Sequence, residues 1–357
     1  MRNVPIAERL REPLRAAFRG ERTDWPELTA EDLRALTEHG VAPLVYAVTG
    51  LPQLRGEAIA AAARESVRAH DVAGVLDALA ARGADALLMK GTALAYDVYA
   101  APELRPRADT DLLVPVDQVE AVRTAMQALG FREVPSSGDE HGNRQAVFMR
   151  HGHAYDVHWS VTNVPLFDAA LPFEAVRARA VAVPALGPNA RALGRIDALL
   201  LACIHRVAHH HDSDRVIWLV DIALLRERMS RDEHRLFWRM AAEGRVVAIC
   251  ERSIELADEW LSRPPHDRAA DYLSAGERGR NEPSRVFLNR NITRGRVMVA
   301  NLRALSWRAR MRRLWQLAFP PRSFVRHTLG SRSKAVLPLL YVYRGARGVA
   351  RLFRKAR

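Results

Sequence analysis

The hydrophobic and polar positions divide the chain into helical ends and a mixed middle. Residues 1–82 repeat apolar side chains at helical spacing, and Thr29 with Asp32 forms a helix-start pattern. Residues 83–160 alternate strand and helix patterns, whereas residues 196–261 are helical again. The pattern predicts an α+β fold whose strand-containing core is flanked by N- and C-terminal helical segments.

The middle segment contains the strand signals, and the boundaries follow from them. Turn-forming residues 135–139 separate two of the strands, and residues 264–283 have the composition of a linker or exposed loop. The predicted strands are 86–89, 109–114, 131–134, 145–150 and 154–159, and the predicted helices between them are 92–99 and 116–129. The predicted divisions are an N-terminal helical segment (1–82), a core (83–185), a helical domain (186–282) and a basic C-terminal region (283–357).

Lys90-Gly91-Thr92 is a candidate phosphate-binding turn. It stands where a short strand gives way to a helix, and the first backbone N–H groups of a helix are unpaired and carry the positive end of its dipole. Gly91 allows close approach of a ligand, Thr92 is expected to cap the helix, and Lys90 adds a positive charge. The three residues therefore predict a nucleotide phosphate site.

Three carboxylates follow this turn. Asp109 and Asp111 alternate at the start of a strand, so both project from the same face, and Asp156 lies with His158 on one face of a later strand. Carboxylates held close together need a cation between them, and oxygen ligands suit Mg²⁺ or Mn²⁺ better than zinc. The sequence therefore predicts a divalent metal site that uses Asp109, Asp111 and Asp156.

Both features have simpler interpretations. An Asp-x-Asp pair before an apolar strand is often only a solvated strand start, because short motifs match by chance. Asp156 has a structural alternative as the ion-pair partner of Arg105 or Arg107, since buried networks also use carboxylates.

Taken together, these motifs resemble a known family. The matching segments are Lys90-Gly91-Thr92, Arg105-Pro106, Asp109-x-Asp111-Leu112-Leu113-Val114 and Asp156-x-His158-Trp159. They are similar to the bacterial uncharacterised nucleotidyltransferase family within the DNA polymerase beta-like superfamily. The resemblance is strongest over residues 83–160 and continues weakly over residues 205–225. It implies a nucleotidyltransferase core with a small mixed sheet.

The resemblance also implies a reaction: metal-dependent transfer of a nucleoside monophosphate from an NTP to an acceptor, with release of pyrophosphate. Asp109, Asp111 and Asp156 would be the catalytic, metal-binding carboxylates. Lys90, Gly91 and Thr92 would hold the nucleotide phosphates, and the helical residues His205, Arg215, Trp218 and Asp221 would face the nucleotide. Neither the NTP nor the acceptor is identified by the sequence.

The positive charge of the chain is concentrated at one end. The formal net charge is +13, and residues 283–357 hold 19 Arg and Lys but no Asp or Glu. Trp307, Met311 and Trp315 recur there at helical spacing among arginines, which predicts a basic amphipathic helix. Pro320-Pro321 would end this helix, and residues 347–355 again combine apolar with basic side chains. Such a segment suits an anionic membrane surface or a nucleic acid, and the alternative is a helix packed on the body with its basic face in solvent.

The remaining composition is that of a globular chain. Its 357 residues are 48% hydrophobic, Cys203 and Cys250 show no paired framework, and neither a signal segment nor a run of about 18 apolar residues is present. We therefore expect a cytoplasmic protein. Its basic C-terminal region leaves open a peripheral association with the inner membrane face. His205 and the run 209–211 lack the zinc-protease pattern and are expected at a helix end or in solvent.

Two other function classes remain open. One is a glycosyltransferase, which also uses an Asp-x-Asp pair to hold a metal and a nucleotide-sugar diphosphate. The other is a non-catalytic nucleotide-binding protein or membrane-associated adaptor that keeps the fold. No Walker A loop and no GxGxxG pattern is present, which argues against a P-loop kinase or a dinucleotide enzyme.

Overall fold

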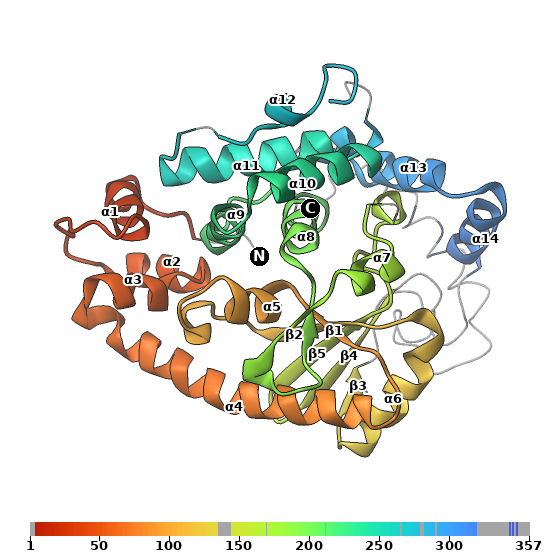
Figure 1. Cartoon of the computed structure of the whole chain (residues 1–357), viewed down its shortest axis with the longest axis horizontal. Helices are drawn as coiled ribbons and strands as arrows, with labels where there is room; N and C mark the ends of the chain where they lie inside the picture. Colours follow the sequence, from red (N-terminus) through yellow and green to blue (C-terminus); the bar gives the residue numbers. More distant parts are fainter. Residues whose placement is uncertain are drawn as a thin grey trace.

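The computed structural model has helices on both sides of one mixed β-sheet (Figure 1). It describes residues 4–134 and 144–319, apart from residues 169, 211, 265, 279–281 and 290, together with residues 343, 345 and 348. The expected turn at 135–139, His211, Pro320-Pro321 and nearly all of segment 347–355 lie outside the described residues.

The elements follow the predicted order, with helical ends and strands in the middle. The strands are β1 (Leu87–Met89), β2 (Asp109–Leu113), β3 (Arg132–Val134), β4 (Gln145–Arg150), β5 (His153–His158), β6 (Val181–Ala182) and β7 (Arg191–Ala192). The α-helices are α1 (Glu8–Phe18), α2 (Ala30–Glu38), α3 (Ala42–Thr49), α4 (Arg55–Ala80), α5 (Lys90–Asp97), α6 (Val119–Ala128), α7 (Phe173–Ala178), α8 (Arg195–Ala208), α9 (Val216–Glu227), α10 (Arg231–Glu243), α11 (Val247–Leu261), α12 (Ala269–Tyr272), α13 (Arg294–Ala304) and α14 (Trp307–Ala318). The α+β class with flanking helices is therefore confirmed.

The sheet is mixed, in the order β3-β4-β5-β2-β1-β7-β6. At its centre β2 runs parallel to β5 and antiparallel to β1, and β4 is antiparallel to β5. Because side chains alternate between the two faces of a strand, this pairing brings residues from separate parts of the chain onto a common face.

Two helical layers cover the sheet. On one face, Leu112 and Val157 pack with apolar side chains of α4 and α6. On the other face, Met89 and Leu113 join the larger core formed with α1–α3, α5 and α8–α11. Figure 1 shows α4 along one side of the sheet and the α8–α11 bundle on the other. The Asp109–Asp111 face is thus the one that meets the helical bundle.

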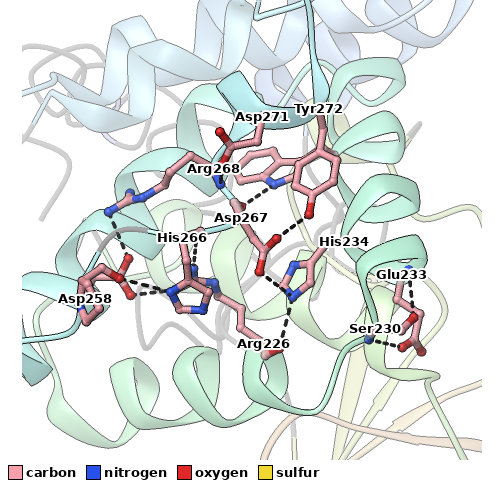
Figure 2. Close-up of polar contacts among 12 residues, drawn as sticks. Arg226, Ser230, Glu233, His234, Asp258, His266, Asp267, Arg268, Asp271 and Tyr272 are labelled. Atoms are coloured by element: carbon pink, nitrogen blue, oxygen red, sulfur yellow. Dashed lines mark hydrogen bonds and ion pairs between the residues drawn. The ribbon is translucent and has the colours of Figure 1, made fainter.

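The predicted linker is instead a bonded part of the bundle. Arg226 of α9 donates hydrogen bonds to Asp258 of α11 at 2.6 Å and to the His266 carbonyl at 2.7 Å (Figure 2). The Asp267 carboxylate lies 3.5 Å from His234 of α10. Arg268 of the same segment lies 2.9 Å from Asp258, so the described part of segment 264–283 contacts α9, α10 and α11. Most of its described residues are exposed, as expected for a loop, but the segment is not a free linker.

The C-terminal region also begins inside the body. Both Glu282 oxygens accept hydrogen bonds from the Val247 and Ala248 amides and so cap α11. Phe287 is buried against Phe167, with ring centroids 5.3 Å apart. Residues 283–292 therefore contribute to the core.

The described part of the basic C-terminal region contains two helices, α13 and α14, and Trp307, Met311 and Trp315 lie on the second. Ser306 separates the two helices, because its hydroxyl accepts a hydrogen bond from the Ala309 amide and starts α14. None of the described helices combines the length and the apolar character that a membrane crossing needs.

Candidate active site

The parallel pairing of β2 with β5 creates the candidate site. Asp111 and Asp156 are direct partners in the register, so their side chains leave the sheet side by side on one face. His158 lies two residues after Asp156 and therefore shares that face. The pairing of β2 with β5 thus brings together two aspartates that are 45 residues apart in the sequence.

Asp111, Asp156 and His158 form a compact group. One ligand atom from each lies within 4.8 Å of the other two, and Asp111 and His158 are buried. Two carboxylates and one imidazole are a donor set that binds divalent cations. An imidazole ligand prefers transition metals to Mg²⁺. These residues fit a divalent metal ion.

Lys90 lies within this group because of the β1 register. Met89 is opposite Asp111, so the next residue starts α5 beside that carboxylate. The Lys90 Nζ atom is 2.6 Å from Asp111 Oδ1 and 3.4 Å from His158 Nε2. Its φ of +54° lies in the left-handed region, which a residue with a Cβ adopts at some cost in energy. The structure thus directs Lys90 to a carboxylate.

The electrostatics of the buried pair favour an ionised Asp111 and a neutral His158. Burial by itself would raise the pKa of Asp111, but Lys90 and the 2.9 Å contact with His158 outweigh it, so the pKa lies below its usual value. Burial and the Lys90 charge lower the pKa of His158 against the opposing effect of Asp111. A neutral imidazole is the form that binds metals.

Asp156 and Asp109 differ from Asp111 because their pKa values are raised. Burial, then Asp111 and Asp109, raise the pKa of Asp156 to about 6. Burial and Asp111 likewise raise the pKa of Asp109, which stands at the start of β2 opposite Ala154. A cation bound here would stabilise the ionised form of both carboxylates.

Gly91 and Thr92 occupy the first turn of α5, which begins two residues earlier than predicted. Thr92 is therefore not the cap: Met89 holds the N-cap position, and the Thr92 hydroxyl is buried with no hydrogen-bond partner among the described residues. A Cβ added at Gly91 would lie 3.4 Å from Arg105 Nη1. The glycine thus lets an arginine approach the start of the helix.

The arginines around the site are held by other carboxylates. Arg105 forms two hydrogen bonds to Asp221 of α9, at 2.7 and 2.8 Å, and Arg107 pairs with Glu65 of α4 at 2.7 Å. Asp156 is therefore not the ion-pair partner of Arg105 or Arg107. The two pairs fasten the segment before β2 to both helical layers.

A small cavity of about 50 Å³ lies between the Gly91 turn and helices α8 and α9. Its lining includes Lys90, Gly91, Arg105, Asp221 and two aromatic side chains, His205 and Trp218. The structure thus brings together the turn and three of the helical residues that the resemblance placed near a nucleotide, and the fourth, Arg215, lies 5.2 Å from the Trp218 ring.

The end of α8 reaches the same place. Burial, Lys90 and other histidines, including His158, lower the pKa of His209 to about 3. The His209 Nε2 atom is buried without a partner in the described part of the chain, and His209 caps the C-terminus of α8. A helix end was expected here, whereas the burial of the Nε2 atom was not.

With this geometry in place, the comparison with protein families is decisive. A family model described as uncharacterised nucleotidyltransferase matches residues 21–262. The chain belongs to this nucleotidyltransferase family. The match spans the carboxylate sheet and helices α2–α11, so it covers every residue of the candidate site described above. No curated protein matches the chain.

Two features of the candidate site were not assigned from the sequence. His158 stood in the motif and on the correct face, but no role was given to it. The contact between Lys90 and Asp111 depends on the β1–β2 register, which the residue pattern of three-residue β1 does not specify. The i, i+2 spacing of Asp156 and His158 was the available signal for the imidazole.

Proposed function

We propose that the protein transfers a nucleoside monophosphate from an NTP to a hydroxyl-bearing acceptor. In this reaction the acceptor oxygen forms a bond to the α-phosphorus, the bond from that phosphorus to the bridging oxygen breaks, and pyrophosphate leaves. The observation that carries the proposal is the Asp111–Asp156–His158 group beside the first turn of α5 in a chain of this family.

Asp111, Asp156 and His158 are the residues proposed to hold the divalent metal, with Asp109 completing the set of carboxylates. Mg²⁺ or Mn²⁺ is the proposed ion, and when bound it would neutralise phosphate charge and activate the attacking oxygen. The raised pKa of Asp156, caused by burial and by two neighbouring carboxylates, supports a place for a cation here. If Asp156 is not a ligand, it is the base that takes the acceptor proton.

Lys90, Gly91 and Thr92 are the residues proposed to hold the triphosphate. The amides at the start of α5 attract an anion, and Lys90 is the first residue of that helix. Thr92 is the least supported of the three because its side chain is buried. The small cavity lined by Trp218 and His205 is the proposed place for the nucleoside.

Membership of the family favours this reaction over the two rival classes. An Asp-x-Asp glycosyltransferase does not require the Lys90-Gly91 turn, and a non-catalytic adaptor does not require a metal-binding group. We further propose a cytoplasmic location and a division of the chain at residues 82, 185 and 282. The pairing of β7 with β1 favours a core that continues past residue 185 to Ala192, and the burial of Phe287 favours a C-terminal region that separates from the body after residue 292.

The test is incubation of the full-length protein with α-labelled NTPs, Mg²⁺ or Mn²⁺, and cell extract, followed by a search for labelled product. Label should enter an acceptor in the wild type and not in Asp111→Ala. Equal labelling by Asp111→Ala would remove the proposal, and binding of NTP without any labelled product would favour the non-catalytic alternative.

A further inference from the structure

A second cavity, larger than the one beside the Gly91 turn, lies apart from the carboxylate group. It encloses about 1090 Å³ between the C-terminal helices α13 and α14 and the segment that follows β5. Leu113, which pairs with His158 in the sheet, and Trp159, which follows His158, both line it. The cavity therefore begins at the end of the two strands that carry the candidate site, yet it shares none of the proposed site residues.

The walls of this cavity combine apolar with polar side chains, and its charged side chains are mainly arginines. Its apolar lining includes Leu113, Val161, Leu171, Val297, Leu302 and Leu305. Arg144, Arg312 and Arg313 also line it, against one carboxylate, Asp168, which pairs with Arg144. Ligand pockets are typically about 300–1,000 Å³, so this cavity has room for a large ligand with an extended apolar part and an anionic group.

Helix α14 presents its two sides in an unusual way. Ala309, Arg312, Arg313 and Leu317 line the cavity, whereas Trp307 and Trp315 on the opposite side are 69% and 66% exposed. Met311, Leu314 and Phe319 extend this exposed stripe. A surface helix of a soluble protein normally buries its apolar stripe. Arg308 and Arg312 are exposed, as the alternative of a packed helix with a solvated basic face requires, but the apolar stripe of α14 is exposed as well.

The chemistry of this region selects the partner. Residues 283–357 carry no acidic side chain, so a second copy of the same surface would be repelled and an anionic partner attracted. Exposed Trp and Met side chains on a basic helix suit the interface of an anionic bilayer, where indole rings lie at the level of the headgroups. A nucleic acid would satisfy the arginines but would leave the apolar cavity unused.

We propose that the cavity binds the acyl chain of an anionic phospholipid with its phosphate at the arginines, and that the α14 stripe rests on the membrane that supplies the lipid. This inference goes beyond the proposed nucleotidyl transfer and does not depend on it. The lipid enters from the side of α14, because that helix forms both the wall of the cavity and the exposed stripe.

The experiment uses the full-length protein with phosphatidylcholine vesicles that contain phosphatidylglycerol bearing a photoactivatable acyl chain. After flotation, the bound protein is irradiated, digested and mapped by mass spectrometry. Cross-links should appear at cavity residues such as Val161 and Leu305. Flotation should require phosphatidylglycerol and weaken as salt is added.

Three variants separate the cavity from the stripe. Ala309→Trp fills the cavity and should abolish the cavity cross-links while flotation persists, and Ala304→Trp, on an exposed position of α13, is its matched control. Trp307→Ala with Trp315→Ala should abolish flotation. Arg312→Ala with Arg313→Ala, which adds no bulk, should weaken flotation by roughly fivefold for each arginine.

Any of three results would overturn the proposal. These are equal flotation on pure phosphatidylcholine, cross-links confined to the α14 stripe, or Ala309→Trp labelled at the cavity like the wild type. Binding of RNA at low salt without any binding to vesicles would assign the basic region to nucleic acid instead. All variants are compared by circular dichroism, so that a variant that fails to fold is replaced by the Arg312 and Arg313 pair.

Discussion

The Lys90 ammonium lies 2.6 Å from the Asp111 carboxylate, so a residue of the candidate phosphate turn neutralises a candidate metal ligand. A metal ion and this ammonium compete for the same oxygen. Lys90 is free to serve the triphosphate only when it leaves Asp111, so binding of metal and NTP should be mutually favourable.

Lys90→Met should therefore tighten Mn²⁺ binding in the absence of nucleotide. Two unit charges about 4 Å apart near a protein surface interact by about 1 to 4 kcal/mol, so a gain of at least about fivefold is expected. The same variant should bind the Mn²⁺–NTP complex more weakly. Calorimetric titration of both ligands checks this, with Arg64→Met, which removes an exposed cation, as control. Weaker Mn²⁺ binding by Lys90→Met would show that the lysine organises the ligands.

Gly91→Val should weaken NTP binding much more than Gly91→Ala. A Cβ at Gly91 would make ordinary contact with Arg105 at 3.4 Å, but the extra methyl groups of valine must displace the arginine or occupy the approach to the α5 amides. Equilibrium binding of a labelled NTP with Mg²⁺ measures the difference. Equal affinity in all three proteins would place the phosphates elsewhere.

Asp221→Ala should destabilise the fold strongly. It would leave the Arg105 guanidinium buried without its partner and would remove the acceptor of the Tyr99 hydroxyl, 2.7 Å away. Breaking a buried ion pair from one side typically costs about 3–5 kcal/mol. Urea unfolding is the measurement, and Asp232→Ala, whose ion pair with Arg235 is exposed, should change the free energy of unfolding by less than about 1 kcal/mol.

His39 should make stability fall on acidification. Burial lowers the pKa of His39 below the ordinary value of about 6.5. Its Nδ1 atom accepts a hydrogen bond from the Val216 amide at 3.1 Å, and its Nε2 atom lies 3.0 Å from the Val4 carbonyl. The unfolded chain therefore takes up a proton at a pH where the folded ring stays neutral. Stability is then complete above the unfolded pKa and declines as pH falls below it. Urea unfolding between about pH 7.5 and pH 5 should show a smaller decline for His39→Gln.

The sequence predicted strands β1 to β5 and the strand faces of their carboxylates because both depend on local patterns, whereas the two-residue strands β6 and β7 were not predicted. Strand β4 has the predicted bounds, and Asp156 and His158 share a face as the i, i+2 spacing requires. The helix start at Lys90 was missed because Thr92 is a stronger capping residue than Met89, and the strand register overrode that preference.

Contacts between distant segments were not predictable from one sequence. The partner of Arg105 is 116 residues away, and no local signal distinguishes Asp221 from Asp156 for that role. The exposed stripe of α14 was missed for a different reason: periodicity shows that a helix has an apolar face but does not show what the face meets. Ser306 was the available sign that the basic helix would break.

The most direct test of the metal site is electron spin echo spectroscopy of Mn²⁺ bound to the protein with a non-hydrolysable NTP analogue. Coordination by His158 should give nitrogen modulation in the wild type, and His158→Gln should lose this modulation while it retains Mn²⁺ through Asp111 and Asp156. Asp111→Asn should lose the bound ion itself. Unchanged nitrogen modulation in His158→Gln, or full Mn²⁺ binding by Asp111→Asn, would contradict the assignment of the metal to this group.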